Sequence, residues 1–319
     1  MLTVYRRLDN RLVAADDPAA ALKDGSAVWI DLLRPSDAEE KLVEATYGVD
    51  VPTETERAML EFSARFYQED GALVLTATLV TLANEKPKSD GVSFILTKTN
   101  TLITVRAIEP TAFRVGQGRA SARIDNAADG GDVLMALLEA VIERLADVLA
   151  EVSTRAQKLS DAVFNKHHFG AADMRPALAE LSALGVIVTM GRDSLGSLER
   201  LFSFAGKRCD AHGLPADQMA ALLRDAEQLD RQGDAMQDHL VFLLDGVLGL
   251  VAANQNVAIQ RLSVFASVFV PSTLIASIFG MNFEAMDWFK AAWGPWVAFM
   301  LMFAASGAAL LIARWRRWI

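Results

Sequence analysis

A glycine, a methionine and an asparagine stand at the end of a long apolar segment, where polar side chains are unusual. Gly280, Met281 and Asn282 follow the run "SVFASVFVPSTLIASIF", and the acids Glu284 and Asp287 come directly afterwards. An asparagine amide is costly when it faces lipid, but is acceptable when it faces water or another subunit. Its carbonyl oxygen is also a ligand that a hard cation accepts. The end of this segment is therefore expected to face water or another subunit rather than lipid.

Other polar residues with suggestive spacing do not complete a reactive site. Cys209 and His212 have C-x-x-H spacing, but no second pair exists to finish a zinc site. The consecutive His167 and His168 point apart on a helix end. The "GQG" at 116–118 lacks the strand and helix that a nucleotide loop requires. With no triad and no paired-carboxylate cleft, the sequence predicts neither an enzyme nor a resident cofactor.

Two adjacent segments are long enough to cross a bilayer. Residues 262–283 and 291–313 contain no Asp, Glu, Lys or Arg. A hydrocarbon core needs roughly 20 helical residues, so each segment predicts one transmembrane helix; a pair of buried helices in a soluble protein is the alternative. The loop 284–290 is short, so the two spans form a hairpin whose outer ends face the same side.

The charges that flank the hairpin predict its orientation. The tail 314–319 carries three arginines and Arg261 precedes the first span, whereas the loop carries two acids and one lysine. The positive-inside rule places both termini in the cytoplasm and the loop outside. Tryptophans gather at the outer boundary and at the inner one, as in an aromatic belt: Trp288, Trp293, Trp296, and then Trp315 and Trp318.

The N-terminal range 1–131 reads as a small α/β domain. "AVWIDLL" at 27–33 is an apolar strand, and a capping box of Ser36 and Glu39 opens a helix that ends at Gly48. Two hairpins are expected, one turning at 70–71 (Asp-Gly) and one near Asn100. The net charge of −9 argues against a nucleic-acid partner, and the single cysteine excludes an internal disulfide.

Helical periodicity replaces this pattern from residue 132. The range 132–216 predicts helices over about 133–165 and 171–204. A third helix begins near Asp217 and has no strong stop before Gly280, although Gly233 could bend it. Its cytoplasmic part, 217–261, is a stalk, and the whole helix would be about 95 Å long. The expected fold is thus an α/β cytoplasmic domain, long helices and a two-span transmembrane hairpin.

At these residues the chain resembles the CorA superfamily of divalent-cation channels, which includes ZntB-type zinc transporters. The resemblance rests on "FVPSTLIASIFGMNFEAM", the short acidic loop, the second span and the basic tail, with "VWIDLLRPSDAEEKL" similar to the family's N-terminal domain. It covers essentially the whole chain and is specific in the last sixty residues. It implies a CorA-like oligomeric funnel, a homopentamer in the cell inner membrane, whose partners are its own copies, the bilayer and divalent cations.

The resemblance gives the asparagine a role. One amide selects nothing, but a ring of Asn282 side chains presents carbonyl dipoles to a cation on the axis, and Gly280, Met281 and Asn282 together form the expected selectivity filter. Magnesium dehydrates reluctantly, so neutral amides could hold the hydrated ion through its water shell. Gly280 would let the chain leave the helix, with left-handed backbone angles as one possibility. A helix C-cap asparagine is the alternative.

Helical periodicity extends the pathway inward from the filter. Steps of three or four residues give one face with polar outer positions, an apolar middle and an asparagine at the cytoplasmic end: Ser277, Thr273, Val270, Ala266, Ser263, Ile259 and Asn256. Thr273 and Asn256 match positions that the family uses for ion passage. Small-residue packing is the alternative for Thr273 and Ser277, and a solvated stalk position for Asn256. Glu284 and Asp287 either attract cations or belong to a solvated loop.

The stalk suggests control by cytoplasmic metal. Its first turns carry four acids that could meet a neighbouring subunit and hold a divalent cation: Asp225, Glu227, Asp230 and Asp234. In the related magnesium channels such binding means a closed pore. The alternative is a solvated acidic face, because Arg224 and Arg231 lie close and the spacing departs from the family pattern.

The expected function is passive influx of a divalent cation, with Mg²⁺ as the expected ion and Co²⁺ and Ni²⁺ as further ions of the same class. Met281 favours the magnesium branch over a driven Zn²⁺ transporter of the ZntB type. A membrane-anchored receptor or scaffold without conduction is the alternative from another class.

Overall fold

The computed structural model describes residues 1–8, 11–58, 61, 65–83, 86–122, 129–165, 170–281 and 293–316. The chain divides into two compact units. The first contains Met1–Lys166 and Ala177–Leu243, and the second contains His167–Pro176 and Leu244–Ile319.

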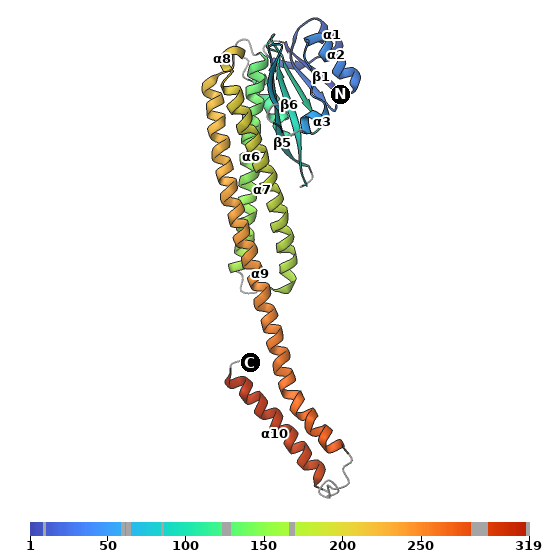
Figure 1. Cartoon of the computed structure of the whole chain (residues 1–319), viewed down its shortest axis with the longest axis vertical. Coiled ribbons are helices and arrows are strands. Elements are labelled where there is room, and N and C mark those ends of the chain that lie inside the picture. Colours follow the sequence, from blue (N-terminus) through green and yellow to red (C-terminus); the bar gives the residue numbers. More distant parts are fainter. Residues whose placement is uncertain are drawn as a thin grey trace. The chain divides into compact units, whose positions relative to one another are not determined.

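The first unit is built on a seven-stranded mixed sheet with the order β2-β1-β3-β7-β6-β5-β4 (Figure 1). The central pair β3 and β7 is parallel, and the other neighbours are antiparallel. The strands are β1 (Leu2–Leu8), β2 (Arg11–Ala14), β3 (Ala27–Leu33), β4 (Phe66–Glu69), β5 (Ala72–Ala83), β6 (Lys86–Leu96) and β7 (Leu102–Arg106).

Both predicted hairpins are present. Asp70 and Gly71 have φ of 48° and 79°, the left-handed angles of a type I′ turn, and Asn100 has φ of 59° between β6 and β7. The pairing of β5 with β6 is a third hairpin that the sequence did not indicate. Its β6 half opens with "KPKSD", where no apolar alternation marks a strand.

Helices cover both faces of the sheet (Figure 1). On one face α1 (Pro18–Lys23) and α2 (Asp37–Tyr47) bury apolar residues against the strands, as Val43 does against Ile30 and Ile103. The predicted capping box is present, because the Ser36 N–H donates to a Glu39 carboxylate oxygen at 2.8 Å. The short α3 (Glu54–Ala58) follows, and α5 (Thr111–Ala122) belongs to the opposite face.

The predicted long helices are present. They are α6 (Gly130–Ser160), which continues as the π-helical turn η1 (Asp161–Asn165), then α7 (Ala171–Gly206), α8 (Cys209–His212), α9 (Ala216–Gly280) and α10 (Gly294–Trp315). One core contains strand residues such as Phe94 together with Leu137 of α6 and Leu198 of α7. The strands therefore share one core with α6 and α7.

Among the described residues, three helices are long and apolar enough to cross a membrane: residues 172–206, 216–280 and 294–315. The first of these belongs to the core of the first unit, since Leu195, Leu198 and Leu201 of α7 are fully buried there. The end of α9 and all of α10 remain, and they coincide with the two spans expected from the sequence. The loop 284–290 lies outside the described residues.

Candidate ion pathway in the second unit

One face of α9 packs against α10 through the membrane segment. The partly covered residues of α9 are Val264, Val268, Pro271, Ser272, Ile275 and Phe279, which recur every three or four positions. Two of them make direct contacts, because the Ser306 hydroxyl of α10 lies 2.6 Å from the Ser272 hydroxyl and donates to the Val268 carbonyl at 3.3 Å.

Small residues on α10 permit this approach. The positions of α10 that are not fully exposed mostly have small side chains: Gly294, Val297, Ala298, Met302, Ala305, Ser306, Gly307, Ala309 and Ala313. Small side chains at matching turns let two helix backbones come close, which is the usual basis of helix association in lipid. The hairpin therefore has a defined inner face.

The predicted pore-lining residues lie on a different face of α9. Val270 and Thr273 are about 160° and 100° around the helix from Ser272. All seven predicted residues are exposed in the single chain: Asn256, Ile259, Ser263, Ala266, Val270, Thr273 and Ser277. This face is not occupied by α10 and is open to lipid or to other copies of the chain. Its four polar members favour water or protein over lipid.

The hydroxyl of Thr273 is oriented by a hydrogen bond within its own helix. It donates to the Phe269 carbonyl of its own helix at 2.8 Å. This bond uses the only hydroxyl proton, and the oxygen lone pairs that remain can only accept. Toward an ion or its water shell, Thr273 is therefore an acceptor, as a cation pathway requires.

The predicted filter motif begins at the last residue of α9. Gly280 is the last helical residue, and the Met281 N–H donates to the Ile278 carbonyl at 3.3 Å. Gly280 is not among the described glycines with positive φ, and a Cβ added to it would meet nothing within 4 Å in this chain. The possible left-handed conformation is thus not adopted, because the helix continues through this residue. Asn282, Glu284 and Asp287 lie outside the described residues.

The four stalk acids do not form one cluster within the chain. Arg192 of α7 pairs with Asp230 at 3.1 Å and with Asp234 at 2.5 Å. Asp225 is five residues before Asp230, about 140° away around the helix. Among the described residues no group of three His, Cys, Asp or Glu side chains could hold a metal ion. A regulatory metal at these acids, shared between copies, stays a prediction.

The pKa values of Arg192 and Glu199 on α7 are shifted by the acids of α9 that lie near them. The hydrogen bond that the Arg192 guanidinium donates to the Asp230 carboxylate raises the pKa of Arg192. Burial raises the pKa of Glu199, and the negative charges of Asp230 and Glu227 raise it further. The side of α9 that faces α7 is therefore rich in negative charge, and Arg192 pairs with two of its acids. The sequence did not single out Arg192, because its partners are 38 and 42 residues away in the chain.

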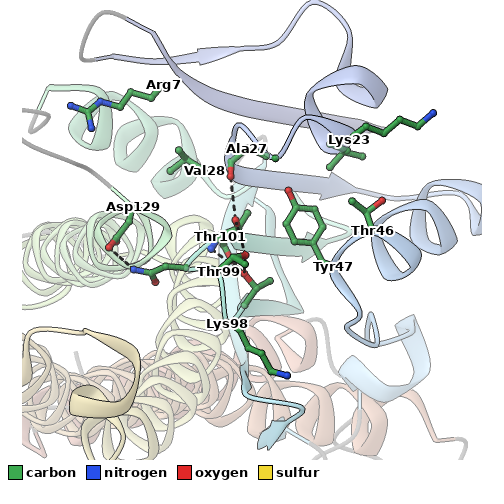
Figure 2. Close-up of a pocket in the computed structure, with 14 residues that line it drawn as sticks. Arg7, Lys23, Ala27, Val28, Thr46, Tyr47, Lys98, Thr99, Thr101 and Asp129 are labelled. Carbon is green, nitrogen blue, oxygen red and sulfur yellow. Dashed lines mark hydrogen bonds between the residues drawn. The ribbon is translucent and has the colours of Figure 1, made fainter.

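The first unit contains a pocket lined by residues of β3, α2 and the β6–β7 turn. It has a volume of about 690 Å³ and lies beside the β6–β7 turn (Figure 2). The Thr101 hydroxyl donates to the Ala27 carbonyl, and Asp129 accepts from Asn100 and caps α6. In Figure 2 the side chains of Lys23 and Lys98 point away from each other. The hydrogen bonds of Thr101 and Asp129 join the β6–β7 turn to β3 and to the start of α6, so these polar groups stabilise the fold.

The cysteine and histidine of the C-x-x-H pair are also structural. Cys209 is buried, and its thiol donates to the Ala205 carbonyl at 3.5 Å. Burial lowers the pKa of His212, and the positive charge of Arg208 lowers it further.

Comparison with known proteins identifies the family. A family model described as CorA-like Mg²⁺ transporter protein matches residues 24–316. The chain belongs to the CorA family. It is 30% identical over 321 residues to the magnesium transport protein CorA of Salmonella typhimurium, with both chains covered completely. Membership makes it an ion-transport protein of the membrane.

Solved structures agree with the CorA fold. The CorA magnesium transporter from Methanocaldococcus jannaschii matches with a TM-score of 0.76 at 16% identity, covering 100% of this chain and 99% of that one. The cytoplasmic domain of ZntB from Vibrio parahaemolyticus matches with a TM-score of 0.52 at 11% identity, covering 79% and 98%. At these identities the matches establish the fold alone.

Proposed function

We propose that this CorA-family chain forms a homopentameric channel that carries Mg²⁺ passively into the cell. The observation that carries the proposal is the exposed face of α9 from Asn256 to Ser277, which leads to Gly280-Met281-Asn282 and is not covered by α10. The full-length similarity to a magnesium transport protein supports the choice of ion.

A pore needs more than one copy of the chain. One hairpin of two helices cannot enclose an aqueous path, so the exposed face of α9 must meet the same face of other copies. Such an arrangement puts the hydroxyls of Thr273 and Ser277 near the outer end of the path. Val270, Ala266 and Ile259 then form an apolar constriction, which can close by dewetting. The number five comes from the family resemblance.

The filter chemistry suits a strongly hydrated ion. A ring of Asn282 carbonyls offers neutral oxygen acceptors, which can hold the water shell of Mg²⁺ without stripping it. Co²⁺ and Ni²⁺ of similar size would also pass. Glu284 and Asp287 would raise the local cation concentration outside the mouth.

The orientation follows from the flanking charges. Arg261 and the arginines of 314–319 support a cytoplasmic location for both termini, and the resemblance to the CorA family supports the inner membrane. The first unit is then cytoplasmic, so that internal metal can reach Asp225, Glu227, Asp230 and Asp234 and control the pore.

A ZntB-type Zn²⁺ transporter is the second candidate. It is favoured by the fold similarity to a ZntB domain and by the pairing of Asp230 and Asp234 with Arg192, which leaves fewer acids for a regulatory magnesium. Met281 favours the magnesium branch. A scaffold without conduction is the third outcome of the same test.

The decisive experiment is metal flux into proteoliposomes, with Mg²⁺, Co²⁺, Ni²⁺ and Zn²⁺ supplied in turn. We expect Mg²⁺ to enter without a proton gradient, and we expect Asn282→Ala to abolish entry while the oligomer remains intact. Asn254→Ala is the matched control, because it removes an exposed amide of α9 that lies about 160° around the helix from Asn256 and so off the predicted pore face. Zinc flux that depends on a proton gradient would select the second candidate. The absence of all flux would select a scaffold.

A further inference from the structure

Two serines join the membrane helices at the middle of the first span. Ser272 stands halfway along 262–283, and its hydroxyl oxygen is 2.6 Å from that of Ser306 on α10. The Ser306 hydroxyl also lies 3.3 Å from the Val268 carbonyl, and the Ser272 hydroxyl lies 3.4 Å from the Met302 carbonyl. Each serine therefore reaches both the hydroxyl and the backbone of the opposite helix.

The two available protons can satisfy this group completely. Each hydroxyl has one proton, and the 2.6 Å contact uses one of the two. If Ser272 donates to Ser306, the second proton goes from Ser306 to the Val268 carbonyl. If Ser306 donates to Ser272, the second proton goes to the Met302 carbonyl or, at 3.3 Å, to Val268. In every arrangement the chain of bonds ends on a carbonyl, and no hydroxyl is left unpaired in the hydrocarbon region.

The serines sit beside the weakest point of the pore helix. Pro271 lies inside α9 directly before Ser272. Its ring lacks an N–H, so the carbonyl of Ser267 loses its usual helical donor, and the helix can bend or rotate there. The contacts to α10 are made at the next residue and at Val268, one residue beyond the carbonyl that loses its donor.

We propose that the Ser272–Ser306 pair is a positioning device that fixes the rotation of α9 against α10 at the proline. This inference rests on the proposed pore function. With Ser272 held toward α10, the face that carries Val270 and Thr273 is turned away from α10 and toward the other copies. Loss of the pair frees the helix to rotate at Pro271, which carries the hydroxyl of Thr273 off the pore axis. Neither serine touches the ion.

The test compares two isosteres at one position. Ser306→Thr keeps the hydroxyl and Ser306→Val replaces it with a methyl group of the same shape. We expect Ser306→Val to conduct about three- to twentyfold less than Ser306→Thr per assembled oligomer, the factor expected for one interhelical hydrogen bond in a membrane. The control is Ser267→Ala, because the Ser267 hydroxyl donates only to Ser263 of its own helix, at 2.8 Å. Equal flux through the Thr and Val variants overturns the inference.

A second readout separates rotation from a general loss of packing. In a Cys209→Ala background, Thr273→Cys should react with an aqueous thiol reagent, and Ser306→Val should slow that reaction while Ser306→Thr restores it. An unchanged labelling rate contradicts the proposal even if flux falls. The proposed function fails separately: if Asn282→Ala conducts normally, the pore assignment is wrong, whatever the serine variants do.

Discussion

Arg192 of α7 lies directly against Gly233 of α9. A Cβ built on Gly233 would come within 2.8 Å of the Arg192 Cγ. The guanidinium continues past the glycine to Asp230 at 3.1 Å and Asp234 at 2.5 Å, one on each side of it in the sequence. Gly233 does not end or break the helix, since α9 is continuous there; the missing side chain makes room for the arginine.

The substitution Gly233→Ala should therefore destabilise the first unit. An alanine in a helix is normally about 1 kcal/mol better than a glycine, but here its methyl group would push the Arg192 side chain off both aspartates. Gly185→Ala on α7 is the matched control, because a Cβ there meets nothing within 4 Å. Thermal unfolding in detergent should show a lower Tm for Gly233→Ala and an equal or higher Tm for Gly185→Ala. A higher Tm for both would mean that the contact with Arg192 is easily relieved.

Much of the fold could be predicted because its signals are local. The turn residues Asp70 and Asn100, which have left-handed backbone angles, each indicate a hairpin from a few neighbouring residues. The capping box at Ser36 likewise indicates the start of α2. The ends of α9 were predicted to within one residue, because Pro215 and the Gly280 motif bound a long periodic run.

What could not be predicted depends on contacts between distant residues. The pairing of β5 with β6 could not be predicted because the first half of β6 is polar and shows no strand pattern. The ion pairs of Arg192 could not be predicted because they join residues about 40 positions apart. The same holds for Ser272 and Ser306, which read as ordinary small residues in two apolar segments. Helical periodicity predicted which residues of α9 share the face from Asn256 to Ser277. Only the packing of α9 against α10 shows that this face is exposed and that the opposite face is covered.

Gating by internal metal can be tested through the same ion pairs. Changing Asp225, Glu227, Asp230 and Asp234 together to their amides should let flux persist at internal Mg²⁺ concentrations that close the parent channel. Arg192→Gln should do the reverse: it removes the ion-pair partner of Asp230 and Asp234, so closure should need about fivefold less Mg²⁺, the factor for roughly 1 kcal/mol. Influx is followed as internal Mg²⁺ is raised. If all three proteins close at one concentration, the sensor lies elsewhere.

Topology is open to a labelling test. In a Cys209→Ala variant, Ala285→Cys should react with a membrane-impermeant thiol reagent added to intact cells, because the loop is expected outside. A cysteine placed after Ile319 should react only once the cells are broken. Labelling in the opposite pattern would invert the assigned orientation and, with it, the side from which metal controls the pore.

Glu199 gives a prediction for pH. Its pKa is raised from the ordinary value of 4.5 by burial and by nearby acids, so the folded state disfavours the charged form. An acid with a raised folded pKa costs no stability below its unfolded pKa and reduces stability as pH rises through that value to the folded one. Glu199→Gln should therefore raise the Tm at pH 7, and its advantage over the parent should vanish near pH 4. Asp238→Asn, at an exposed acid of α9, is the control. An advantage for Glu199→Gln that is the same at both pH values would show that packing, rather than ionisation, is responsible.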